Sequence, residues 1–154
     1  MDERDVKKGR VIEFLNKHNV KGILLTLRSN FAWYTCGRDN HVVSASEKGA
    51  ASVLVTSGDD YIITTNIEGP RIRDEECPEH FKVIEYPWHK PDEMGQTLEK
   101  LTGGGVVLSD DGSAGLKLLP EEFASLRYSL TEEEVERYRA LGADASRAVS
   151  ETCR

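Results

Sequence analysis

The amino-acid sequence predicts an α/β fold with a mixed sheet flanked by helices. Helical and strand patterns alternate along the chain, which is typical of α/β domains. Two consecutive strand patterns are separated only by residues 57–60, Ser-Gly-Asp-Asp, so at least one strand pair is antiparallel. The chain has 154 residues, 38% of them hydrophobic, and both values are ordinary for one globular domain.

The first part of the chain predicts a helix and then three strands. Apolar residues from Val11 to His18 recur at helical spacing, and Asn19 tolerates the left-handed conformation that ends many helices. Residues 28–50 have no clear period and are expected to form a loop. Short apolar runs predict strands over residues 22–26, 52–56 and 61–65.

The second part continues the alternation. The triple glycine at 103–105 is interpreted as a helix stop and not as a phosphate loop, because no Lys-Ser/Thr follows it and a strand pattern comes next. The predicted elements are, in order, a short helix capped by Asn66 that runs through Ile72, a strand over 81–86, a helix from Asp92 to Leu101, a strand over 106–108 and a helix that begins at Pro120.

The last residues predict a helix with a well-formed start. Thr131 and Glu134 have the spacing of a capping box, and Leu130 and Val135 stand at the positions of a hydrophobic staple. The helical period continues through Glu151–Arg154 with no Gly or Pro stop at its end. Two interpretations are open: the helix folds back onto its own sheet, or it continues into a second domain, which the missing stop favours.

The acidic balance of the chain argues against several classes of protein. The 20 Lys and Arg against 27 Asp and Glu leave a net charge of −7, so nucleic-acid binding is disfavoured. No apolar run approaches the roughly 18 residues of a membrane span, and the first residues contain no apolar segment of a signal peptide. Cys36, Cys77 and Cys153 are widely spaced and suit reduced thiols, so a cytoplasmic location is expected.

One segment of the predicted loop gathers candidate binding residues. Trp33 or Tyr34 could pack a ligand, Arg38 could hold a carboxylate, and His41 could move a proton. The alternative is that the aromatic residues belong to the core and that the charged ones are solvated. Residue chemistry alone leaves both interpretations open.

Other polar clusters are interpreted without a catalytic role. Cys77, Glu79 and His80, with His89 nearby, form only one of the two ligand clusters that zinc sites usually show, and are interpreted as an exposed loop. The adjacent pairs Asp110–Asp111 and Glu121–Glu122 are interpreted as solvated turn and helix-start charges. No catalytic residue and no metal site is therefore predicted.

Two segments resemble the N-terminal domain of the creatinase, prolidase and aminopeptidase P family. Residues 30–37, Asn-Phe-Ala-Trp-Tyr-Thr-Cys-Gly, are similar to the family's Asn-apolar-x-Tyr/Trp-Leu-Thr/Ser-Gly segment, with one extra residue before the glycine. Residues 127–135, running on to Ala140, resemble the family's Arg-x-x-Lys-Ser/Thr-x-x-Glu-Ile linker helix, with Leu130 in place of the usual Lys. The two segments stand at the separation expected for the family, with the same order of elements between them, so the resemblance covers nearly the whole chain.

The resemblance implies a creatinase N-terminal-domain-like fold, with about six strands in a ribonuclease-H-like arrangement. It divides the chain into that domain (1–126) and a linker helix (127–154) that leads to an absent C-terminal catalytic domain. The parent would be a metal-dependent Xaa-Pro dipeptidase, prolidase or aminopeptidase P, a pita-bread hydrolase with two divalent metals (Mn, Co or Zn). All metal ligands would follow Arg154, so residues 1–154 are expected to hold no cofactor.

In such enzymes the N-terminal domain builds a homodimer and reaches over the partner's active site. By that resemblance, Trp33, Tyr34, Arg38 and His41 are expected to line the neighbouring subunit's substrate pocket. Two alternatives remain. The parent is a creatinase-type amidinohydrolase or a catalytically dead protein-binding relative, or the chain is a stand-alone α/β binding module.

Overall fold

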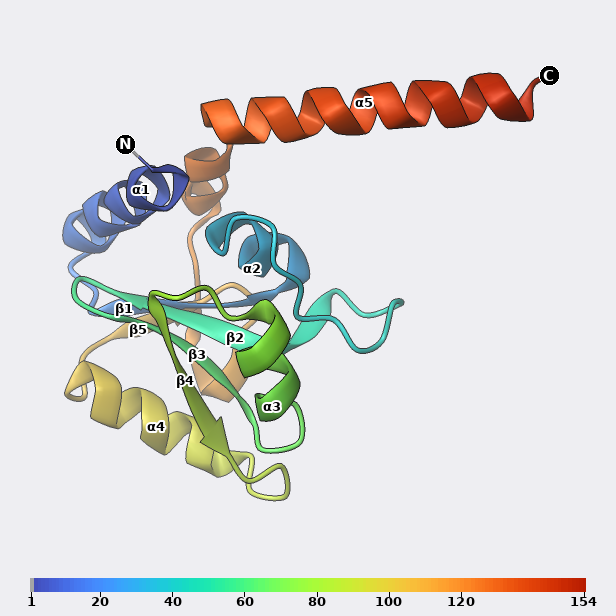
Figure 1. The fold of residues 1–154 in the computed structure, drawn as a ribbon. Coiled ribbons are helices and arrows are strands. Elements are labelled where there is room, and N and C mark those ends of the chain that lie inside the picture. Colours follow the sequence, from blue (N-terminus) through green and yellow to red (C-terminus); the bar gives the residue numbers. More distant parts are fainter. Residues whose placement is uncertain (1) are drawn as a thin grey trace.

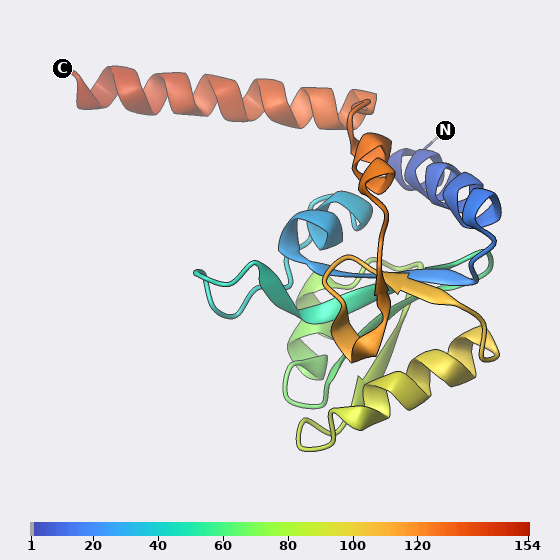
Figure 2. The ribbon, with the colours of Figure 1, turned by 180° about the vertical axis from the view of Figure 1, so that it is seen from behind.

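A six-stranded mixed sheet with helices on both faces forms the body of the protein (Figures 1 and 2), as described by a computed structural model of residues 2–154. The fold class that the sequence predicts is thereby confirmed. The strands are β1 (Gly22–Leu27), β2 (Lys48–Thr56), β3 (Asp60–Thr65), β4 (Phe81–Tyr86), β5 (Val107–Ser109) and β6 (Lys117–Leu118). Their order is β4-β3-β2-β1-β5-β6. The β1–β2 and β2–β3 pairs are antiparallel, and the other three pairs are parallel.

Helices cover the sheet on opposite sides. On one face lie α1 (Glu3–His18) and α2 (Arg28–Tyr34), and on the other lies α4 (Asp92–Thr102) (Figure 1). Successive residues of β1 point to opposite faces, so Ile23 and Leu25 join the core under α1 and α2, while Leu24 joins the core under α4. The continuous apolar run of β1 is thus explained by burial on both faces.

The predicted helix stops are confirmed by backbone geometry. Asn19 ends α1 with a φ of 51°, and Gly103 ends α4 with a φ of 63°; both residues are in the left-handed region. The hairpin of β2 and β3 is also confirmed, with Val53 paired to Ile62.

The segment expected to be a loop, 28–50, contains two regular elements. Its first seven residues form α2, and its last three already belong to β2. A helix of two turns is too short to show a period and is stabilised by burial, here of Phe31, Trp33 and Tyr34. The expectation of a loop was therefore wrong for 28–34 and for 48–50.

Two predicted helix starts also differ from the structure. Asn66 does not cap the helix that follows β3: α3 (Gly69–Arg71) begins after Glu68 and runs into a π-helical turn, Ile72–Glu76. The side-chain oxygen of Asn66 instead accepts the amide of Trp88 at 2.9 Å. Pro120 precedes a 3₁₀ helix (Glu121–Arg127), not an α-helix. The two-residue strand β6 and the 3₁₀ turn Ser113–Gly115 were not predicted.

The last helix, α5 (Glu132–Thr152), leaves the body of the protein (Figures 1 and 2). Its capping box is confirmed, because Glu134 N donates to Thr131 Oγ1 and Thr131 N donates to the Glu134 carboxylate. Every residue of α5 from Glu136 on is exposed, so the helix does not fold back onto the sheet. No helix within residues 2–154 combines the length and apolar composition needed to cross a bilayer.

Candidate functional site

The four candidate residues of the sequence lie on α2 and on the loop that follows it, but they differ in accessibility. The side chains of Trp33 and Tyr34 belong to the core, with 7% and 0% of their surface exposed. Arg38 is exposed and His41 is half-buried. The fold thus brings the four residues into one neighbourhood, and only the last two present their side chains to solvent.

Tyr34 is part of a buried polar cluster. Its hydroxyl donates to Asp60 Oδ2 at 2.9 Å, and the same carboxylate pairs with Arg4 and Lys8 of α1. Burial, followed by the Asp60 charge, raises the pKa of Tyr34 far above its usual value. Of the two interpretations that the sequence left open for Tyr34, the structure therefore supports a place in the core.

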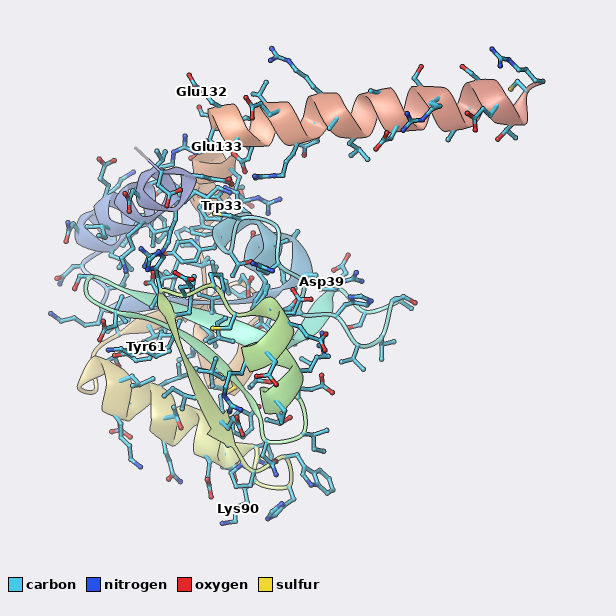
Figure 3. All side chains as sticks on the ribbon, in the orientation of Figure 1. Trp33, Asp39, Tyr61, Lys90, Glu132 and Glu133 are labelled. Carbon is cyan, nitrogen blue, oxygen red and sulfur yellow. The ribbon has the colours of Figure 1, made fainter. Side chains whose placement is uncertain are left out.

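Trp33 lies between the core and the surface beside α5 (Figure 3). Its ring packs edge-on against Phe123, with centroids 6.1 Å apart, and the ammonium of Lys7 lies 5.6 Å from its centroid. The ring also borders a pocket of about 430 Å³ between α2 and α5, with Leu130, Tyr138 and Leu141 on the opposite wall.

The loop after α2 is organised around Asp39. The amide of His41 donates to Asp39 Oδ1 at 2.9 Å, and the His41 ring pairs with Asp39 Oδ2 through Nδ1. The Asp39 amide donates to Glu76 Oε2 at 2.9 Å, and Arg38 donates to the Glu75 carbonyl at 3.3 Å. Burial alone would raise the pKa of Asp39, but the bonds from His41 and the charge of Arg28 outweigh it, so this pKa is lowered.

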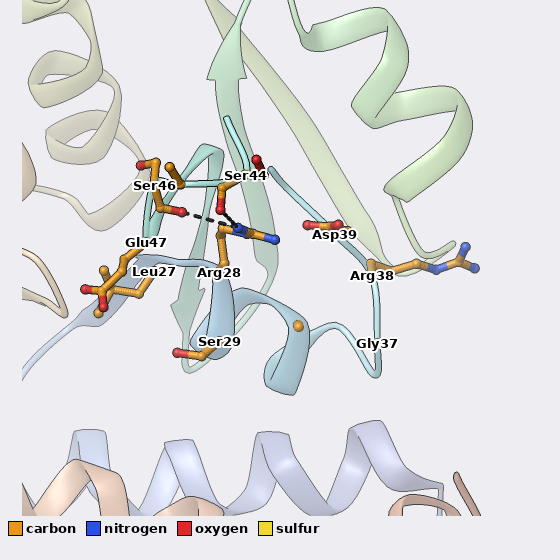
Figure 4. A pocket seen from close by; sticks show the side chains of 11 residues that line it. Leu27, Arg28, Ser29, Gly37, Arg38, Asp39, Ser44, Ser46 and Glu47 are labelled. Atoms are coloured by element: carbon orange, nitrogen blue, oxygen red, sulfur yellow. Dashed lines mark hydrogen bonds between the residues drawn. The ribbon is translucent and has the colours of Figure 1, made fainter. Parts of the chain in front are cut away.

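A second, larger pocket of about 650 Å³ lies between the start of α2 and this loop (Figure 4). Arg28 donates from Nη1 to the carbonyls of Ser44 and Ser46, at 3.0 and 3.3 Å, and so holds the far side of the loop. In Figure 4 the Arg28 and Asp39 side chains point toward one another, while Arg38 points outward. The pocket thus has a guanidinium and a carboxylate on its wall, and both can bind a charged or polar group.

The pair Asp110–Asp111 was wrongly interpreted as solvated. The two oxygens of Asp110 accept the amides of Thr26 and Leu27, at 2.8 and 3.0 Å, where β1 passes into α2. Only 2% of the Asp111 side chain is exposed, and it pairs with Lys48 of β2. Burial raises the pKa of Asp110. For Asp111, burial also acts to raise the pKa, but Lys48, Ser113 and Ser109 outweigh it and lower the pKa to about 2.

The signal that could have identified this pair is its place directly after a buried strand. Polar residues at the ends of neighbouring strands of a sheet meet at its edge, and β5 lies beside β1. Asp110 also accepts from the Asn30 amide at 2.9 Å, and Asn30 in turn accepts from Arg127 at 2.6 Å. Asp110 therefore positions α2, which carries Trp33 and Tyr34 and leads into the loop with Arg38 and His41.

Residues 2–154 contain no group of three or more His, Cys, Asp or Glu side chains that could hold a metal ion. The Cys77 thiol instead donates to the carbonyls of Pro78 and Phe81, at 3.4 and 3.7 Å. The two divalent metals that the family resemblance implies therefore do not fit these residues, and we assign them no metal-dependent step.

Comparisons with known proteins show a similarity of fold but find no match by sequence. Neither a scan against models of protein families nor a search of curated proteins finds a match. Solved structures of Xaa-Pro peptidases do match. An Xaa-Pro dipeptidase from Bacillus anthracis superposes with a TM-score of 0.60 at 14% identity, over 86% of this chain and 38% of that one. A prolidase from Pyrococcus horikoshii gives 0.58 at 17% identity, over 84% and 37%.

A structure of the N-terminal domain of an Xaa-Pro dipeptidase from Lactobacillus brevis is matched over most of its own length. Its TM-score is 0.50 at 13% identity, and the match covers 82% of this chain and 84% of that domain. The chain thus has the fold of the N-terminal part of Xaa-Pro peptidases. It spans less than two fifths of the length of the Bacillus and Pyrococcus chains.

Proposed function

We propose that residues 1–126 are the non-catalytic N-terminal domain of a longer hydrolase of the Xaa-Pro dipeptidase and aminopeptidase P class, and that residues 127–154 are the helix linking it to the catalytic domain. In this proposal the domain serves homodimerisation and covers the active site of the partner subunit in the cytoplasm. The observation that carries the proposal is the fold match, which covers 86% of this chain but only 38% of the Bacillus dipeptidase.

The course of α5 supports the assignment of a linker. The helix is anchored only at its start, and its apolar residues Tyr138, Leu141 and Val149 are each more than 60% exposed. A helix with an exposed apolar side is stable when that side packs against another element. A following domain would supply that element.

Within this proposal, Arg38 and His41 are the residues that meet the partner's substrate. A guanidinium recognises a carboxylate group, and the His41–Asp39 pair can accept or donate a proton. Trp33 and Tyr34, whose side chains are packed in the core, would support the wall of that substrate pocket. The bond-breaking step is assigned to residues after Arg154, where two divalent metals (Mn, Co or Zn) would be held.

Hydrolysis assays test the proposal directly. Residues 1–154, incubated with Xaa-Pro dipeptides and Mn²⁺, are expected to release no proline above the buffer blank, whereas the product of the complete reading frame is expected to release it. Proline release by residues 1–154 alone would overturn the assignment.

The codons that follow Arg154 provide the second test. An Asp, Asp, His, Glu, Glu ligand set there supports a metallopeptidase. A stop codon directly after Arg154, or a downstream domain without that set, overturns the catalytic part of the proposal in favour of a binding protein. Turnover of creatine instead of Xaa-Pro peptides by the complete product would assign an amidinohydrolase.

A further inference from the structure

The helix α5 is joined to the body of the protein over a very short stretch. Of its residues only Glu134 is buried, and Val135 is half-buried; Thr131, the residue before the helix, is buried as well. All residues from Glu136 on are exposed. Whatever fixes the direction of this 21-residue helix must therefore act within its first two turns.

The contact at this point is an ionic cluster centred on Lys7 of α1. Only 1% of the Lys7 side chain is exposed. Its ammonium donates to Glu3 Oε1 at 2.5 Å and to the Trp33 carbonyl at 2.5 Å, and it pairs with Glu134 Oε1 at 2.9 Å. The ammonium thus donates hydrogen bonds to α1 and α2 and forms an ion pair with α5.

Arg137 closes the cluster one turn further along α5. Its Nη1 and Nη2 donate to the two oxygens of Glu3, at 2.8 and 2.7 Å, in the bidentate geometry that an arginine and a carboxylate favour. The second oxygen of Glu134 accepts the Thr131 amide at 2.9 Å, so the residue that pairs with Lys7 also caps the helix. Two cations and two carboxylates thus balance, with Lys7 and Glu3 almost wholly buried.

The chain just before α5 is fixed separately. Arg10 donates to the carbonyls of Leu126 and Ser129, at 3.1 and 2.7 Å, and so ties this segment to α1 about one turn away from Lys7. Loss of the Lys7 cluster would leave the Arg10 contact in place. The helix would then be free to turn only about the residues between Ser129 and Glu132.

We propose that Lys7 is a latch that sets the direction of α5 relative to α2. Removal of Lys7 leaves the Glu3–Arg137 pair as the remaining ionic tie between α1 and α5, and α5 then takes a wider range of directions about residues 130–131 while the sheet and α1 remain folded. The same ammonium also bonds to the Trp33 carbonyl of α2. It therefore couples the position of α5 to the position of α2 and of the loop over 35–47 that follows α2. The inference does not rest on the proposed function.

A distance measurement on residues 1–154 tests the latch. Cys153 is exposed at the far end of α5 and accepts a spin label, and Lys100→Cys on α4 provides the second label, in a Cys36→Ser/Cys77→Ser background. Double electron–electron resonance is expected to give one narrow distance distribution. Lys7→Met is expected to broaden it at least twofold, while a pair within the body, Lys100→Cys with Glu13→Cys, keeps its width.

Lys8→Met is the matched control. Lys8 is the next residue of α1, but it bonds to the carbonyls of Thr56 and Gly58 and to Asp60 and not to α5. The α5 distance distribution is expected to keep its width in this variant. Equal broadening in Lys7→Met and Lys8→Met would mean a general loosening of α1 and would overturn the latch, as would an unchanged width in Lys7→Met.

A second variant applies if Lys7→Met does not fold. Glu134→Gln retains an oxygen for the capping box, a motif that accepts Gln as well as Glu, but removes the charge that faces Lys7. Broadening of the α5 distance in Glu134→Gln, with an unchanged body distance, is the expected result. A distribution as narrow as that of the unmodified chain would overturn the proposal.

Discussion

Two buried carboxylates, Glu3 and Asp60, each hold two cations. Glu3 pairs with Lys7 and with Arg137 of α5, and Asp60 pairs with Arg4 and Lys8. The four pairing residues at the start of α1 thus form two rows, since positions 3 and 7 and positions 4 and 8 are each one turn apart. One row faces α5 and the other faces the sheet. These charged side chains therefore fix α1 against both α5 and the sheet.

At this scale we expect Asp60→Asn to lower the free energy of unfolding by about 3 kcal/mol, because it leaves two cations facing one neutral group at a buried site. Urea denaturation at pH 7 measures the change. Asp59→Asn is the control. Asp59 is exposed and pairs with Lys82 on the surface, so the urea midpoint of this variant should equal that of the unmodified chain. Equal losses in the two variants would contradict the buried role of Asp60.

The second residue-scale prediction concerns acid. Burial alone would raise the pKa of Glu3, but Arg137 and Lys7 outweigh it and lower the pKa from 4.5 to about 2. A lowered carboxylate pKa means that the unfolded chain binds the proton first. The contribution of Glu3 is thus complete above pH 4.5 and is lost as the pH falls toward 2. Glu3→Gln should flatten the fall of the urea midpoint between pH 5 and pH 2, and an unchanged slope would contradict it. Glu13→Gln, on the exposed side of α1, is the control.

At the scale of elements, the length of a helix or strand and its dependence on distant contacts decide whether the sequence predicts it. The periodic helices α1, α4 and α5 and the β2–β3 hairpin were predicted, because each carries its own pattern and its own stop or turn residues. The short elements α2 and β6 were not. Seven residues of α2 show no period, and this helix exists because Asn30 and Phe31 are buried against the sheet and Asp110.

The same reasoning explains the partial success at the site. The sequence placed Trp33, Tyr34, Arg38 and His41 in one segment, and the structure keeps them together, but only contacts distant in sequence, such as Tyr34 with Asp60, assign the aromatic pair to the core. Lys7 carried no signal at all. From the sequence, a lysine among the polar positions of an amphipathic helix is expected to be exposed to solvent. Only the position of α5 in the structure shows that Lys7 is buried.

The element-scale prediction tests the start of α5. Beyond Val135 the helix has no buried residue, so it lacks there the tertiary packing from which most helices in proteins gain their stability. Thr131→Ala removes the capping acceptor and should destabilise the first turn by about 1 kcal/mol. Amide exchange of residues 134–140 should accelerate severalfold. Ser129→Ala, whose side chain is exposed, should leave exchange unchanged; unchanged exchange in Thr131→Ala would show that the Lys7 cluster alone holds the turn.

At the scale of the whole molecule, α5 and the loop over 40–47 extend from the same side of the body (Figures 1 and 2). The two pockets lie between them and share Ser29 and Ala32 of α2 and Gly37 of the loop that follows it. Arg38 lines the larger pocket, so it stands on this side of the body. The proposed contribution to a neighbouring active site would use this side.

The last prediction tests this role in the product of the complete reading frame. Arg38 is exposed and bonds only weakly to one carbonyl, at 3.3 Å, so its loss should not affect folding. If it holds a substrate carboxylate in both ground and transition state, Arg38→Ala should raise KM for an Xaa-Pro dipeptide by about tenfold and leave kcat nearly unchanged. Lys17→Ala, an exposed cation on the far end of α1, should alter neither constant. A lowered kcat with unchanged KM would instead place Arg38 in the reaction step, and unchanged constants would remove it from the site.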